Sequence, residues 1–79
     1  MTAYIATFHT HLSALLTCRA LTAAGVAAQM MPVPRRLSAA CGTCVRYSAE
    51  DPLLERMDAD TEAVYRREGD GYVCLLRNE

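Results

Sequence analysis

The sequence Met31-Pro32-Val33-Pro34-Arg35-Arg36, followed closely by Cys41-Gly42-Thr43-Cys44, separates two predicted strands and fixes where the chain must turn. Proline has no backbone N–H to donate and restricts the preceding residue to extended conformations, so the prolines end a strand and open a loop. Arginines, a glycine and two thiols follow within a few residues, and no other stretch combines so many chemically committed side chains. We therefore expect any functional site to include this stretch.

The first half of the chain predicts a strand, a helix and a second strand. Residues 3–8 alternate larger and smaller side chains and are rich in aromatic and β-branched types, which indicates a strand. Thr10 can cap a helix that begins near His11, and Gly25 can end it. A second strand is predicted over residues 26–33. The expected buried face of the helix comprises Leu12, Leu15, Leu16, Ala20 and Ala23 or Ala24.

The second half predicts a strand, a helix and a strand, after a loop over residues 34–40. Strands are expected over residues 43–47 and 72–76. Asp51-Pro52 is typical of a helix start, because aspartate caps the first turn and proline fits the first helical position. Gly69-Asp70-Gly71 would end that helix. Its expected apolar face comprises Leu53, Leu54, Met57, Val64 and Tyr65.

The resulting order, β-α-β-β-α-β, predicts an α+β ferredoxin-like fold. In that fold a four-stranded antiparallel sheet of order 4-1-3-2 carries both helices on one face. With 79 residues the chain is expected to form a single domain over residues 1–79. This topology would gather several polar segments at one edge of the sheet: His9, Thr10 and His11, then Arg35, Arg36 and Cys41, and Gly69 to Gly71.

Composition excludes several classes of function. Eight basic residues, all arginine, face nine acidic ones, so the net charge of -1 gives no basic footprint for nucleic acid. No run approaches the roughly 18 apolar residues of a membrane span, and the first residues do not resemble a signal peptide. We therefore expect a cytoplasmic protein with reduced thiols. Cys18 and Cys74 lie in apolar segments and are expected to be buried.

Cys41 and Cys44 remain as the cysteines in functional surroundings. A helix start and Arg35 both favour negative charge, which makes Cys41 the candidate reactive thiolate. A redox pair with Cys44 is geometrically awkward, because residues three apart in a strand point to opposite faces. Together with His9 and His11, the two thiols also have the ligand types of a zinc or copper(I) site, although their spacing is a weak signal.

Four segments resemble one known family. Tyr-Ile-Ala-Thr-Phe at positions 4 to 8, Ala24-Gly25-Val26, Met31-Pro32-Val33-Pro34-Arg35 and Cys41-Gly42 are similar to the putative selenium/sulfur carrier-like family of small bacterial proteins. The resemblance implies that Cys41 holds sulfur or selenium as a persulfide or selenosulfide. It also implies donor and acceptor proteins of cysteine desulfurase-like and sulfurtransferase-like types. A small or aliphatic residue is more usual in the family where Cys44 stands.

Three hypotheses follow. The first is a cytoplasmic carrier, without a cofactor and not a turnover enzyme, because no acid–base pair or substrate pocket is legible. The residues expected to bind near Cys41 are His9, Thr10, Pro34, Arg35 and Gly42. The second is a regulatory module, possible as a homodimer, that binds a small anion or a metal (zinc or copper) at the same edge. The third is an interaction protein that recruits a partner through its sheet.

Overall fold

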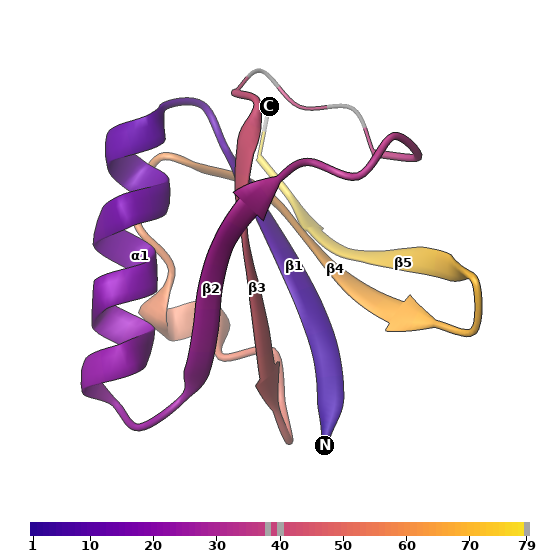
Figure 1. The fold of residues 1–79 in the computed structure, drawn as a ribbon, viewed down its shortest axis with the longest axis horizontal. Coiled ribbons are helices and arrows are strands. Elements are labelled where there is room, and N and C mark those ends of the chain that lie inside the picture. The colour runs from indigo at the N-terminus through magenta and orange to yellow at the C-terminus, as the bar shows by residue number, and fades with distance from the viewer. Residues whose placement is uncertain (38, 40, 79) are drawn as a thin grey trace.

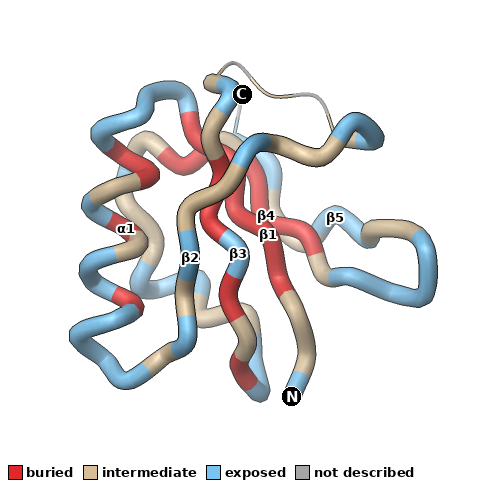
Figure 2. Tube along the Cα trace, in the orientation of Figure 1, coloured by how far each residue is buried: buried red, intermediate tan, exposed pale blue. Residues whose placement is uncertain are grey.

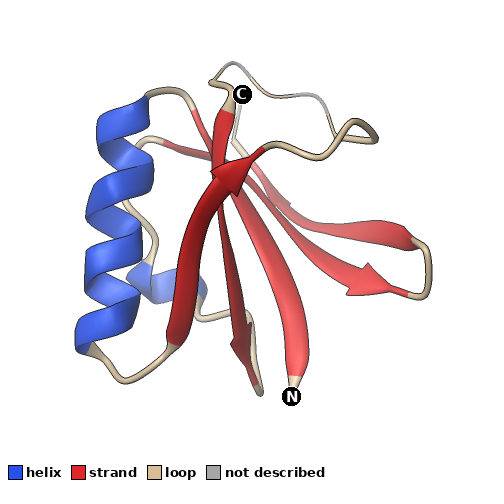
Figure 3. Ribbon diagram, viewed as in Figure 1, coloured by secondary structure: helices blue, strands red, loops and turns tan. Residues whose placement is uncertain are grey.

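The computed structural model of the chain describes residues 1–37, 39 and 41–78, so Ser38 and Ala40 of the predicted loop lie outside the described residues. Five antiparallel strands form one sheet of order β2-β3-β1-β4-β5, and one α-helix packs against one face of it (Figures 1 and 3). The elements are β1 (Thr2–Phe8), α1 (His11–Ala23), β2 (Ala27–Pro32), β3 (Thr43–Ala49), the 3₁₀ helix η1 (Leu54–Arg56), β4 (Thr61–Glu68) and β5 (Gly71–Arg77).

The ferredoxin-like prediction is wrong, because the expected second helix does not form. The described residues form five strands and one α-helix, and the second half of that segment is strand β4, which pairs with β1. Thr61-Glu62-Ala63-Val64-Tyr65 carries β-branched and aromatic side chains that fit a pleated surface. Strand β1 is buried on both faces and needs a hydrogen-bonding neighbour on each side. Strands β3 and β4 supply these neighbours, and the pairing of β4 with β1 takes the place of the predicted helix.

The two signals that suggested a second helix form turns instead. The backbone N–H of Leu53 donates to the Asp51 carboxylate at 2.8 Å, and Leu53 has a left-handed backbone with φ 53°. The Tyr47 hydroxyl donates to the carbonyl oxygen of Pro52 at 2.6 Å and ties this turn to β3. Gly69 has φ +56° in the tight turn between β4 and β5, as hairpin turns that begin with glycine require.

Helix α1 begins and ends where the sequence predicts, but it buries a different face. Thr10 is its N-cap, and Gly25 follows its end with φ +83°. The buried side chains are Ser13, Ala14, Thr17 and Leu21. Leu12 is 62% exposed and Leu16 45% exposed, so the prediction that they pack on the sheet is wrong. Small side chains let the helix lie close to the sheet, and Thr17 also accepts a hydrogen bond from the Asp58 N–H.

The sheet is buried on both faces around β1 and β3 (Figure 2). One face packs under α1 and contains Tyr4, Ala6, Phe8, Val45, Tyr47, Ala49 and Val64. Alternate residues point to the opposite face, which we call the open face because no helix covers it. Ile5, Thr7 and Cys44 lie there and are nonetheless buried. The loop between β2 and β3 contributes to this cover, because its Pro34 lines a pocket together with Ile5.

Candidate functional site

The base of the β2–β3 loop holds Cys41 and Gly42 at the end of the sheet where α1 begins. The N–H of Val33 donates to the carbonyl oxygen of Gly42 at 3.1 Å, which closes the loop beyond the last strand pair. His11 Nδ1 lies 3.3 Å from Thr43 Oγ1, within hydrogen-bond reach, and connects the first residue of α1 to the first residue of β3. The expected proximity of the helix start and the cysteine segment is therefore present.

Cys41 is a free, half-buried thiol in this loop base. Its neighbour Gly42 is exposed, and a Cβ added there would meet no atom within 4 Å. Within the described part of the chain, the direction in which a side chain at Gly42 would point is therefore open.

Cys44 has a different environment, although only two residues separate it from Cys41. Its side chain is fully buried in β3, with Sγ 3.7 Å from the carbonyl oxygen of Pro32. Burial raises the pKa of the Cys44 thiol to about 11, because the thiolate loses its hydration in the protein interior. Cys44 is thus protonated at neutral pH and is a poor nucleophile.

The remaining two thiols are placed unequally. Cys18 is half-buried against the core, but Cys74 is exposed, so the prediction that Cys74 is buried is wrong. Its strand, β5, is at the edge of the sheet and pairs with β4 alone among the described strands. Cys74 Sγ lies 3.5 Å from the carbonyl oxygen of Leu76. Cys74 is therefore a second accessible thiol.

The tip of the loop extends away from Cys41. The N–H of Leu37 donates to the carbonyl oxygen of Pro34 at 3.0 Å and forms a turn. The Arg36 guanidinium donates to the carbonyl oxygen of Asp70 in the β4–β5 turn. Arg35 is exposed. The Arg36 side chain therefore contacts the β4–β5 turn and does not lie at the base of its own loop.

The Gly69–Gly71 turn does not lie at the expected edge. Strand β4 starts beside the end of β1, where Thr61 pairs with Phe8, and it then runs antiparallel to β1. The turn that follows β4 is therefore at the opposite end of the sheet from the start of α1. Only the tip of the loop reaches it, through Arg36.

The polar residues at the start of α1 largely satisfy one another. The Ser13 N–H donates to Thr10 Oγ1 at 3.2 Å, and the Ser13 hydroxyl donates to Asp60 Oδ2 at 2.9 Å. Thr10 Oγ1 also lies 3.1 Å from Asp60 Oδ2. His9 is exposed and donates its backbone N–H to the carbonyl oxygen of Asp60. A carboxylate thus already stands at the positive end of the helix, and Thr10 has a structural role there.

The sequence left a metal site as an alternative use of His9, His11, Cys41 and Cys44. Among residues 1–37, 39 and 41–78, no three His, Cys, Asp or Glu side chains are grouped so that they could hold a metal ion.

Within the same described ranges, no helix has the length and apolar character needed to cross a membrane.

Comparison with known proteins adds one decisive match. Residues 3–65 match the model of the family described as putative Se/S carrier protein-like. The chain belongs to this family. No curated protein and no solved structure matches the sequence. The family match includes Cys18, Cys41 and Cys44, but it ends before β5 and therefore excludes Cys74.

Proposed function

We propose that this member of the family carries sulfur or selenium on Cys41 and relays it between partner proteins. The observation that carries the proposal is the contrast among its thiols. Cys41 is half-buried beside an open glycine backbone, whereas Cys44 is fully buried with a raised pKa. The exposed Cys74 lies outside the residues that match the carrier family.

Loading needs no oxidant, because the donor already holds sulfur at the sulfane level. The Cys41 thiolate attacks the outer sulfur of a persulfide on the donor protein. A new sulfur–sulfur bond forms on Cys41, the bond between the outer sulfur and the donor cysteine breaks, and the donor cysteine leaves as a thiolate. The same displacement with selenium in the outer position gives a selenosulfide.

Discharge is the same reaction in the opposite sense. An acceptor thiolate attacks the outer sulfur on Cys41, and Cys41 leaves as the thiolate, ready for another cycle. After each transfer the Cys41 thiolate is back in its starting state, and the sulfur has only moved from donor to acceptor. The chain therefore acts as a carrier and not as a turnover enzyme. The proposed partners are cysteine desulfurase-like donors and sulfurtransferase-like acceptors in the cytoplasm, which would supply the donor persulfide and the acceptor thiolate.

Gly42 is the feature of the loop that suits such an exchange. A displacement at sulfur requires the attacking and leaving sulfur atoms to lie in line, so the partner's loop must come close to Cys41. Because a Cβ at Gly42 would point into open space, this glycine keeps the approach unobstructed. Arg35 is exposed on the same loop and is available to pair with an acidic group of the partner.

The test is to load the protein with a cysteine desulfurase and cysteine, and then to locate added sulfur by intact mass and peptide mapping. We expect one reductant-labile sulfur on Cys41. Cys41→Ser should abolish it, and Cys44→Ser and Cys74→Ser should retain it. Loading that survives Cys41→Ser, or that maps to Cys74 in the unsubstituted protein, would contradict the proposal.

A further inference from the structure

A pocket of about 150 Å³ lies on the open face of the sheet, apart from the Cys41 loop base. Its floor includes Ile5 of the central strand β1. Met31 of β2 and Tyr72 of β5 line it together with Pro34 from the β2–β3 loop. The Arg36 contact with Asp70 holds the tip of that loop against the β4–β5 turn, so the loop spans this face. The pocket thus has an apolar lining and a partial cover.

Two arginines from different strands line the same pocket, Arg46 of β3 and Arg67 of β4. In the strand register Arg46 lies directly beside Ile5, and Tyr65, two residues before Arg67, lies beside Ile5 on the other side. The two guanidinium groups therefore flank β1 on one face of the sheet. Among the described residues, no carboxylate side chain lines the pocket.

Neither arginine is neutralised by the described part of the chain. No hydrogen bond or ion pair joins Arg46 or Arg67 to another described residue. Arg66 differs, because it points to the other face and forms an ion pair with Glu68 at 2.9 Å.

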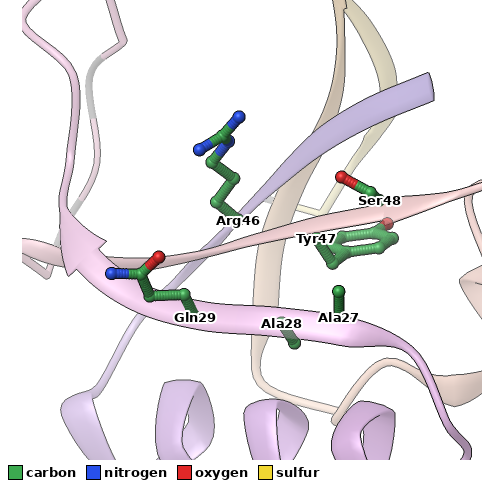
Figure 4. Close-up of a pocket in the computed structure, with 6 residues that line it drawn as sticks. All are labelled: Ala27, Ala28, Gln29, Arg46, Tyr47 and Ser48. Atoms are coloured by element: carbon green, nitrogen blue, oxygen red, sulfur yellow. The ribbon is translucent and has the colours of Figure 1, made fainter. Parts of the chain in front are cut away.

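Arg46 also borders a second pocket of about 260 Å³ along β2 and β3, where Figure 4 shows Gln29, Arg46 and Ser48 on the side of the strands away from α1.

We infer that the open-face pocket binds a small organic anion, a carboxylate or phosphate monoester whose body is no larger than one ring. Guanidinium groups recognise both oxyanions through paired N–H donors, and two unpaired guanidiniums favour a ligand with negative charge. The apolar lining of Ile5, Met31 and Tyr72 suits a ring or short hydrocarbon body. A cavity of about 150 Å³ accommodates a molecule of the size of benzene.

This inference is independent of sulfur transfer by Cys41. Arg67 and Tyr72 follow the segment that matches the carrier family, so half of the charged lining belongs to residues outside the match. The net charge of -1 gives no indication of this site, because the charged side chains that line the pocket, among the described residues, are the two arginines.

The experiment is a titration of the full chain with benzoate and with phenyl phosphate, followed through backbone amide signals in NMR spectra. We expect saturable shifts that are largest at Ile5, Arg46 and Tyr72. Arg46→Gln and Arg67→Gln should each weaken binding by about tenfold, because each removes one charged donor group and keeps most of the side-chain volume. Arg19→Gln is the matched control, since Arg19 is an exposed arginine on α1; it should leave the affinity unchanged.

Neutral benzyl alcohol separates an anion site from an apolar crevice. Binding of benzyl alcohol at least ten times weaker than that of benzoate supports the inference. Equal binding of the two, unchanged benzoate affinity in the Arg46→Gln and Arg67→Gln double variant, or the absence of saturable shifts would overturn it. A preference between benzoate and phenyl phosphate identifies which oxyanion the pocket takes.

Discussion

Cys41 and Cys44 belong to one C-x-x-C motif, yet they occupy regions of the molecule with opposite properties. Cys41 lies half-buried in a loop, beside a glycine that faces open space. Cys44 lies fully buried in β3, a strand that begins at the intervening Thr43. The boundary of the strand, and not the spacing of the cysteines, decides which thiol is available for chemistry.

The strand register explains why the Cys44 thiol is inaccessible to solvent. Cys44 pairs with Thr7 of β1 on one side and with Met31 of β2 on the other, so it lies inside the sheet and not at an edge. Its side chain points to the open face and is buried there near the proline loop. Both Cys41 and Cys44 are free thiols in this arrangement.

The largest expected difference is in alkylation rate. In the native protein at neutral pH, iodoacetamide should modify Cys41 at least about a thousandfold faster than Cys44, because Cys44 reacts only when β3 opens and opening costs several kcal/mol. Peptide mapping of samples quenched over time measures both rates. In denaturant the two rates should converge. Comparable alkylation rates in the native protein would show that iodoacetamide reaches Cys41 in the loop and Cys44 in the strand equally well.

The next effect is a pH dependence of stability. The pKa of Cys44 is raised in the folded state to about 11, so folding favours its protonated form. Its contribution is fully present below the unfolded pKa near 9.0 and is lost as pH rises towards about 11. Across this window Cys44→Ala should lose less free energy of unfolding than the unsubstituted protein, by on the order of 2 kcal/mol.

That measurement must compare how steeply the free energy of unfolding falls with pH in the two proteins, and not its value at one pH. Cys44→Ala also removes buried volume, which lowers stability by a similar amount at every pH. Burial likewise raises the pKa of Tyr47, and its neighbours Tyr4, Asp51 and Glu55 add to the shift, so both proteins weaken at high pH. Urea unfolding at several pH values gives the slopes. Parallel curves for the two proteins would mean that Cys44 does not titrate abnormally.

The smallest expected effect concerns Thr7, the neighbour of Cys44 across the strands. Its hydroxyl is buried and has no hydrogen-bond partner among the described residues. Thr7→Val replaces that hydroxyl with a methyl group of similar size and should raise the free energy of unfolding by up to about 1 kcal/mol. Thr7→Ser is the control, because it keeps the hydroxyl and loses the methyl group. Clear destabilisation by Thr7→Val would instead reveal a partner for the hydroxyl.

Local signals in the sequence were sufficient for much of the fold. Thr10 and Gly25 mark both ends of α1, and alternating or β-branched runs locate β1, β2, β3 and β5. Strand β4 was missed because Asp51-Pro52 and the glycines near position 70 suit the two ends of a helix as well as they suit two turns. The β-branched and aromatic side chains of Thr61, Val64 and Tyr65 are the local signal that favours a strand. The structure pairs that strand with β1.

In the candidate site, too, some features could be predicted from the sequence and others could not. The loop, the accessible glycine and the nearness of α1 to Cys41 follow from adjacent residues and from the first three strands. The exposure of Cys74 and the basic pocket with Arg67 depend on β4 and β5. The sequence assigned Arg67 to a helix and predicted that Cys74 is buried in an apolar strand, so neither feature was anticipated.

The most direct test of Cys41 as the carrier thiol uses two chains with one cysteine each. The first retains Cys41 and carries Cys18→Ala, Cys44→Ala and Cys74→Ser. The second retains Cys74 and carries Cys18→Ala, Cys41→Ser and Cys44→Ala. Each is loaded with a cysteine desulfurase and cysteine, separated from the donor, and mixed with an acceptor thiol while the sulfur on both partners is measured.

We expect the chain that retains Cys41 to gain one sulfur and to deliver it to the acceptor, and we expect the chain that retains Cys74 to remain unloaded. Equal loading and delivery by the Cys74 chain, or failure of the folded Cys41 chain to load, would contradict the assignment of the carrier role to Cys41.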